Sequence, residues 1–237
     1  MKVTSLLLIG AITLASGNLW AASGRQDSID RLQMSSDVLH SIMAAPDKGI
    51  PEEVVNGAKC IVVIPHLVKG GFVLGAEHGR GIASCRTPEG WSAPAFVSIG
   101  GGSWGLQIGV EGVDLVMLVM NDHGFQHLLS SKFQISGDAS ASAGPVGRHA
   151  SAGTDWKMTT EILTYSRSHG IFAGITLDGA VVEQDSDSTI AIYGRDRSFR
   201  DILSGRIPAP RSTTNFMNAI AEIDHAGTLA EVNSDEK

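Results

Sequence analysis

Short apolar runs alternate with glycines along the chain from residue 59 to residue 182. The first run, Lys59–Pro65 (KCIVVIP), is followed after Gly70 and Gly71 by Phe72–Glu77 (FVLGAE). Short apolar runs bounded by glycine are typical of buried β-strands joined by tight turns. Glycine supplies 28 of the 237 residues and shows no collagen-like period. The pattern therefore predicts a β-rich core.

Helical patterns precede and follow these runs. The segment 27–45 places its apolar residues at helical spacing, with Asp27 or Ser28 as the expected N-cap. A second helical pattern covers residues 212–227 near the C-terminus. The sequence therefore predicts the α+β class: a single domain with a glycine-rich, mostly antiparallel β core and N-terminal and C-terminal helices.

Two turn signals indicate hairpins within the β core. Residues 87–90 (TPEG) separate two apolar runs, and Asp178-Gly179 separates the runs 171–177 and 180–182. Asp-Gly is favoured in two-residue hairpin turns because both central residues adopt positive φ there. We therefore expect the strands on either side of Asp178-Gly179 to pair with each other.

The first 23 residues resemble an export signal. Lys2 precedes the apolar stretch Val3–Leu14, and the small residues Ala21-Ala22-Ser23 offer a cleavage site. A membrane anchor is the alternative, but the apolar stretch is shorter than a bilayer requires. We expect a signal peptide at 1–23, one folded domain at 24–230, a flexible tail at 231–237, and an exported protein that is periplasmic or extracellular and peripheral to the membrane.

The charge of the chain limits its partners. Removal of the signal removes Lys2 and no acid, which takes the formal net charge from −7 to −8. A net negative protein is a poor candidate for nucleic-acid binding, and equally for purely electrostatic attachment to anionic lipid. We expect no nucleic-acid partner, and any anion site must be a local basic cluster.

Cys60 and Cys85 are the only cysteines in the chain. A pair of cysteines in an exported protein suggests one disulfide. Cys60 opens one apolar run and Cys85 closes a later one, so the bond is feasible if the two strands are neighbours. Two buried free thiols are the alternative.

The pentapeptide Gly101–Gly105 (GGSWG) matches the G-x-S-x-G pattern of a hydrolase nucleophile elbow. That elbow requires a helix directly after the serine, whereas residues 104–110 (WGLQIGV) are typical of a strand. We therefore expect that the protein is not an enzyme and that the glycines form a sharp turn or bulge. A hydrolase that uses Ser103 is the minor alternative.

His123 and His127 are four positions apart in HGFQH, after the candidate N-caps Asn121 and Asp122. This spacing places both imidazoles on one face of a helix, as metal ligands would be. The glutamate of the H-E-x-x-H motif is missing, and the sequence offers no evident third ligand. We therefore expect no metal and no other cofactor.

Arg80, Arg86, Arg148 and Arg167 lie at predicted strand ends or beside glycines. They either converge in one basic cluster or pair with separate carboxylates, and the 25 acidic residues favour separate pairing. Arg148 belongs to a run of small residues, 139–155, whose backbone N–H groups could approach an anion. A close-packed segment with Arg148 in an internal ion pair is the alternative.

Five motifs together resemble the SYLF domain family over roughly residues 35–205. In order, they are KCIVVIPHLVKGGFVLGAEHGRGIASCR, GWSAPAFVSIGGGSWGLQIG, ASASAGPVGR, YSRSHGIFAGITLDGA and AIYGR. The resemblance implies a non-enzymatic module that binds phospholipid, of phosphatidylinositol type or with another anionic headgroup. Some fungal members bind actin, and bacterial members are commonly exported as single domains.

The resemblance also directs attention to the start of the domain, where eukaryotic members carry a basic amphipathic segment. Here the helix predicted over 28–43 offers an apolar insertion face, and we expect Arg31 and Lys48 to contact lipid. If they cluster, Arg80 and Arg148 would hold a phosphate. The expected partner is membrane phospholipid, and actin is not expected for an exported chain. A structural domain that binds an envelope protein is the alternative.

Overall fold

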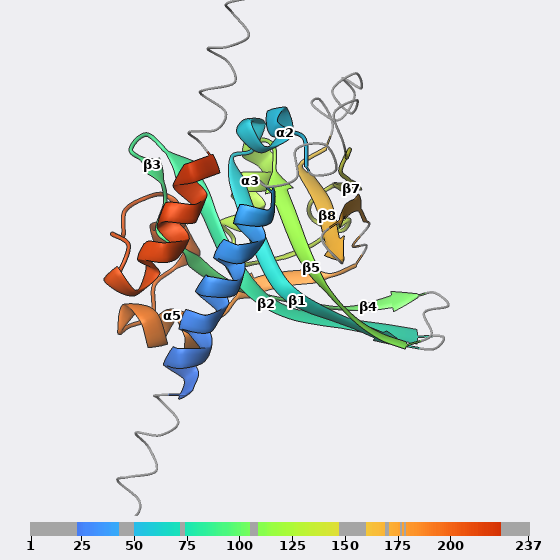
Figure 1. Ribbon diagram of the computed structural model, residues 1–237, viewed down its shortest axis with the longest axis horizontal. Helices are drawn as coiled ribbons and strands as arrows, with labels where there is room; N and C mark the ends of the chain where they lie inside the picture. Colours follow the sequence, from blue (N-terminus) through green and yellow to red (C-terminus); the bar gives the residue numbers. More distant parts are fainter. Residues whose placement is uncertain are drawn as a thin grey trace, which may run out of the picture.

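Figure 1 shows the computed structural model, in which a curled β-sheet has helices packed on both of its faces. The described residues are 23–42, 50–71, 74–104, 109–146, 160–168, 171–175, 177 and 179–223. The predicted signal peptide therefore lies outside the described residues except for Ser23, as do Lys48, Arg148 and the predicted tail.

Ten strands form one sheet in the order β6-β10-β4-β2-β1-β5-β8-β7, with β3 paired to β2 and β9 paired to β8. Their bounds are β1 (Cys60–Gly71), β2 (Leu74–Thr87), β3 (Gly90–Trp91), β4 (Ala95–Trp104), β5 (Gly109–Val119), β6 (Lys132–Gln134), β7 (Ala141–Ala143), β8 (Ile162–Ser168), β9 (Ile171–Gly174) and β10 (Val181–Gln184). Among these pairings, β7 with β8 is parallel and the others are antiparallel. The predicted α+β class is confirmed.

Helices occur before, between and after the strands. An N-terminal helix covers residues 23–42 and a C-terminal helix covers residues 214–223. The others are α2 (Glu52–Gly57), α3 (Asp122–Leu128), α5 (Ser186–Tyr193), α6 (Phe199–Leu203) and the 3-10 turn η2 (Arg211–Thr213). Within the described part of the chain, no helix combines the length and the apolar character needed to cross a bilayer.

Two helix predictions need correction. The N-terminal helix already includes residue 23, so neither Asp27 nor Ser28 is its N-cap. The Ser28 hydroxyl instead donates to the carbonyl of Gly24, one turn earlier. Helix α5 has no counterpart among the predicted helices, although Asp185 caps its start and Gly194, at φ 73°, ends it.

The central strands are buried on both faces. In β1, Cys60, Val62 and Ile64 belong to an inner core that the curled sheet shares with α3 and α6. Ile61 and Val63 face the outer core, where the N-terminal helix, α2, α5 and the C-terminal helix pack. A strand covered on both faces needs apolar side chains at successive positions rather than at alternate ones. This explains the continuous apolar run that the sequence shows.

Strands β1, β2, β4 and β5 extend beyond the helices as an arm, at the right of Figure 1. β1 bulges between Ile64 and Leu67, where its pairing register shifts against both neighbours. Pro65 occupies this site and has no N–H to donate, so regular pairing cannot continue through it. His66 follows at φ 54° and donates its N–H to Asp114.

The predicted disulfide is confirmed. Cys60 and Cys85 are directly opposite each other in the antiparallel β1–β2 pair and are joined by a disulfide bond. Both side chains are fully buried in the inner core. The alternative of two free thiols is therefore excluded.

The hairpin predicted around Asp178-Gly179 is wrong. β9 pairs with β8, while β10 lies between β4 and β6. Gly179 does adopt a positive φ of 82°, so a turn remains at this position. In this arrangement β10 has two strand neighbours, and Val182 of β10 and the preceding Ala180 are buried in the inner core. A hairpin alone would give β10 a single strand neighbour, β9.

Gly101 and Gly102 of GGSWG lie inside β4 and form neither a turn nor a bulge, which corrects the sequence-based expectation for these two residues, while Gly105 lies outside the described residues. Residues 95–104 pair with β2 in unbroken register. A Cβ at Gly101 would lie 2.9 Å from the backbone Cα of Ala180, whereas a Cβ at Gly100 would meet its nearest atom at 3.8 Å. Gly101 therefore permits the chain entering β10 to approach β4 closely.

These two neighbouring glycines give a matched test. Gly101→Ala should lower the free energy of unfolding by about 1–3 kcal/mol, because the added methyl group overlaps backbone. Gly100→Ala should leave stability unchanged or raise it by up to about 1 kcal/mol. Urea unfolding of both variants measures the difference, and equal effects would contradict the close approach at Gly101.

Candidate functional site

The apolar face of the N-terminal helix is part of the outer core. Leu32, Leu39 and Ile42 are nearly or fully buried and pack against the sheet and the C-terminal helix. The exposed face instead carries polar residues such as Asp30 and Asp37. The expectation that this helix offers an apolar insertion face is therefore wrong, because the fold already uses that face.

Arg31 joins this helix to the start of α5. Its guanidinium donates to the Asp185 carboxylate at 2.9 Å and to the Ser188 hydroxyl at 3.1 Å. Asp185 also caps α5 by accepting from the Ser188 N–H at 3.0 Å. The Arg31 and Asp185 side chains are 6% and 10% exposed, so this is a buried ion pair.

Burial and ion pairing shift the pKa of each of these two groups in opposite directions. Burial lowers the pKa of Arg31 despite the Asp185 partner. Burial alone would raise the pKa of Asp185, but hydrogen bonds from Ser188 and the Arg31 charge outweigh it and lower that pKa. Since a guanidinium stays protonated at any pH at which proteins fold, Asp185 is the member of the pair whose titration matters.

A groove opens beside this ion pair, between the N-terminal helix and the sheet, with a volume of about 320 Å³. Arg80 of β2 is exposed at this groove and has no hydrogen-bond or ion-pair partner among the described residues. The complete lining is Asp27, Asp30, Arg31, Met34, Pro65 and Arg80. The groove therefore combines one available guanidinium with apolar surface and two exposed carboxylates.

Two of the four predicted lipid or phosphate contacts meet at this groove. Arg31 and Arg80 both line it, but Arg31 is buried and paired with Asp185. Lys48 and Arg148 lie outside the described residues, so their roles stay predictions. The sequence offered no signal for the groove itself, because its walls come from residues 27–34 and from β1 and β2.

The other two arginines of the predicted cluster have partners of their own. Arg167 pairs with Asp114 at 3.0 Å. The Arg86 guanidinium lies 4.5 Å from the centre of the Trp91 ring and donates to the Ala58 carbonyl. Neither residue lines the groove.

Ser103 does not stand at a nucleophile elbow. β4 continues through Ser103 to Trp104, and the next described element is the strand β5. The strand-to-helix corner that exposes a nucleophilic serine in hydrolases is therefore missing at this position.

Comparison with known proteins identifies the family. The family model "Ysc84: Las17-binding protein actin regulator" matches residues 100–223, more than half of the chain. The chain belongs to this family, the SYLF family. The resemblance that the sequence motifs indicated is confirmed by this match.

Curated relatives support the same assignment. SH3 domain-containing YSC84-like protein 1 from Rattus norvegicus is 34% identical over 167 residues, which cover 70% of this SYLF chain and 49% of that protein. The Homo sapiens protein of the same name is 32% identical over 70% of the chain and 48% of its own length. Protein YSC84 from Saccharomyces cerevisiae is 30% identical over 69% of the chain and 36% of its own length. The SYLF chain thus matches half or less of each relative, and none of these names describes an enzyme.

Proposed function

We propose that this SYLF protein is a non-enzymatic module that binds phospholipid headgroups at an envelope membrane after export. The observation that carries the proposal is Arg80, an exposed guanidinium at the groove without a partner among the described residues. Arginine binds phosphate oxygens through paired, charge-assisted hydrogen bonds. Met34 and Pro65 beside it supply apolar surface for the glycerol and upper acyl region of a lipid.

The charges of the groove favour a zwitterionic headgroup. Asp27 and Asp30 are exposed on the same rim as Arg80. A headgroup such as phosphoethanolamine carries a phosphate for Arg80 and an ammonium for these carboxylates. A polyanionic headgroup of phosphoinositide type, which the family resemblance implies, would be repelled by both aspartates. Anionic lipid is therefore the alternative ligand.

Vesicle binding by an Arg80→Gln variant tests the proposal. Loss of a charge-assisted contact to phosphate should weaken binding to phosphatidylethanolamine-containing vesicles about tenfold or more. Co-sedimentation of the mature chain measures the effect, and Arg200→Gln is the matched control. Arg200 is also exposed but lies on α6, which packs with the inner core on the other face of the sheet. Failure of the unmodified protein to pellet, or equal pelleting of Arg80→Gln, would contradict the proposal.

The headgroup preference has its own test. Asp27→Asn combined with Asp30→Asn should weaken binding to zwitterionic vesicles and strengthen binding to phosphatidylglycerol vesicles. Unchanged binding to zwitterionic vesicles, together with stronger binding to phosphatidylglycerol vesicles, would assign the groove to anionic lipid instead. Both aspartates are exposed, so neither substitution should alter the fold.

A protein partner is the second candidate, and the family description favours it because it names Las17 and actin. Co-sedimentation with purified actin filaments, in the absence of lipid, tests this possibility directly. For an exported chain the corresponding partner would be an envelope protein. Partner binding that needs no vesicles and survives Arg80→Gln would favour this second function.

A further inference from the structure

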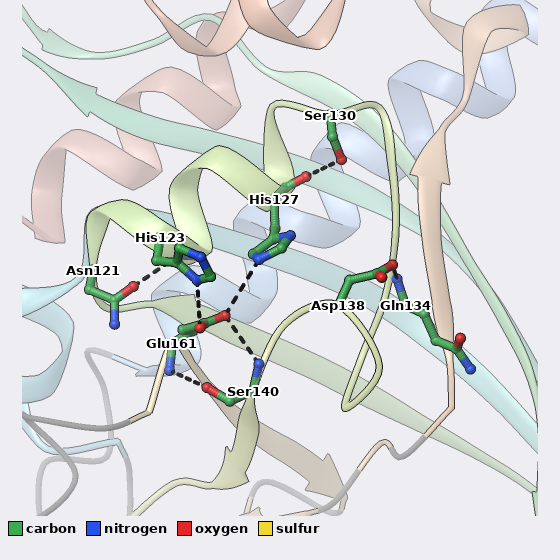
Figure 2. Close-up of polar contacts among 9 residues, drawn as sticks. Asn121, His123, His127, Ser130, Gln134, Asp138, Ser140 and Glu161 are labelled. Atoms are coloured by element: carbon green, nitrogen blue, oxygen red, sulfur yellow. Dashed lines mark hydrogen bonds and ion pairs between the residues drawn. The ribbon is translucent and has the colours of Figure 1, made fainter.

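Two histidines of α3 and the glutamate that precedes β8 converge at the surface of the molecule (Figure 2). His123 Nδ1 lies 2.7 Å from Glu161 Oε1, and His127 Nε2 lies 3.9 Å from Glu161 Oε2. The two imidazole rings have their centres 4.7 Å apart. One donor atom from each of the three residues can be chosen so that all lie within 4.8 Å of one another.

The local structure holds these side chains in place. The Asn121 side chain caps α3 by accepting from the Gly124 N–H at 2.9 Å, which fixes the first turn that carries His123. Glu161 is held by backbone on two sides, because its carbonyl accepts from the Met120 N–H and its carboxylate accepts from the Ser140 N–H at 3.1 Å. The cluster is therefore assembled before any ligand arrives.

His127 supplies a second, independent observation that points to a ligand at this cluster. Its Nε2 atom is buried and has no hydrogen-bond partner. The distance of 3.9 Å to the nearest Glu161 oxygen is too long for a hydrogen bond. A buried polar atom without a partner is costly and uncommon in native structures, so each one calls for an explanation.

We propose that His123, His127 and Glu161 form a binding site for a divalent transition-metal ion of the Zn²⁺ type. Two imidazoles and one carboxylate suit Zn²⁺, Co²⁺ or Ni²⁺ and do not suit Mg²⁺ or Ca²⁺, which prefer oxygen ligands. Zn²⁺ bonds of about 2.0–2.1 Å place tetrahedral ligand atoms about 3.3 Å apart. With one atom taken from each residue, the three donor atoms lie within 4.8 Å of one another, so the more widely spaced of them would draw closer together when the ion binds.

The bound ion would join α3 to the residue that precedes β8. Its fourth coordination position would face solvent, because the His123 side chain is 70% exposed. Glu161 would be a metal ligand and not a general base. The ion would therefore link two elements of the structure and would have no catalytic role. The sequence pattern contained the two histidines but not the third ligand, since Glu161 is 38 positions from His123.

Calorimetric titration of the metal-free full chain with Zn²⁺ tests the site. We expect one ion per chain, and four-coordinate d–d absorption when Co²⁺ replaces Zn²⁺. Even groups that only support a metal ligand contribute about 10–100-fold to affinity, so His123→Gln, His127→Ala and Glu161→Gln should each weaken binding by at least that much. Zn²⁺ at about 100 times its Kd should raise the Tm of the unmodified protein by about 5–10 °C.

A second histidine–carboxylate pair provides the matched control. His40 lies 3.5 Å from Glu222 on the surface, and this pair belongs to no three-residue cluster among the described residues. His40→Gln should bind Zn²⁺ like the unmodified protein. Because His123 is exposed, His123→Gln should keep the unmodified protein's metal-free unfolding midpoint, so its loss of binding would not reflect misfolding. Absence of Zn²⁺ binding, or unchanged affinity in His123→Gln and Glu161→Gln, would overturn the proposal.

Discussion

Replacement of Arg31 by alanine should lower the free energy of unfolding by about 3–5 kcal/mol. The substitution leaves the Asp185 carboxylate buried, 10% exposed, without its counter-charge. It also removes the hydrogen bond to Ser188 and the contact of the guanidinium with the Phe96 ring, at 5.8 Å from the ring centre. Urea unfolding followed by circular dichroism measures the loss.

A double variant separates the loss of the pair from the burial of one unpaired charge. Arg31→Met with Asp185→Ser removes both charges, and serine can still cap α5 in place of Asp185. Replacement of a whole buried ion pair by uncharged groups is often close to neutral, so the double variant should recover most of the stability that Arg31→Ala loses. Equal losses in the two variants would show that the cost comes from lost packing and not from the unpaired carboxylate.

The same ion pair makes stability depend on pH in the acid range. The pKa of Asp185 is lowered in the folded protein, because the hydrogen bonds and the Arg31 charge outweigh burial. The unfolded chain therefore binds the proton more readily, and the contribution of the pair is present above the unfolded-state pKa of about 3.9. It is lost as the pH falls through the lower folded-state pKa. Asp185→Asn should lack this component when unfolding is measured between about pH 5 and pH 2.

Loss of the Cys60–Cys85 bond should lower the free energy of unfolding by about 3.5 kcal/mol. The two residues are separated by 25 positions, and the bond restricts the unfolded chain by closing this loop. Unfolding of the double variant Cys60→Ala/Cys85→Ala measures the effect. Both cysteines are fully buried, so part of the loss will reflect the smaller alanine side chains.

Reduction of the unmodified protein controls for that packing loss. With a reductant strong enough to open the bond, the thiols remain in place and only the covalent link is lost. Reduced protein should therefore be less stable than oxidised protein, and no less stable than the double alanine variant. Equal stability with and without reductant, after the thiols are shown to be free, would contradict a stabilising role.

Several features of this protein were determined by short stretches of sequence. The continuous apolar run Lys59–Pro65 predicts a buried strand, and β1 begins at Cys60 within it. Asn121 caps α3 as its position before HGFQH predicts. The ordered motifs around GWSAP and YSRSHG indicate the family. Each of these depends on periodicity, capping or turn chemistry, which act between residues close together in the chain.

The tertiary structure alone decided which distant segments meet. Arg31 and Asp185 are separated by 154 positions, and no local pattern marks them as partners. The apolar face of the N-terminal helix fits membrane insertion and core packing equally well until the sheet beneath it is known. β10 pairs with β4 and β6 and not with β9, despite the Asp-Gly signal. Glu161 joins His123 and His127 in one cluster although it lies far from them in the sequence. For the N-terminal helix and β10, burial against the curled sheet decided the outcome, because packing free energy depends on the whole surface that is covered.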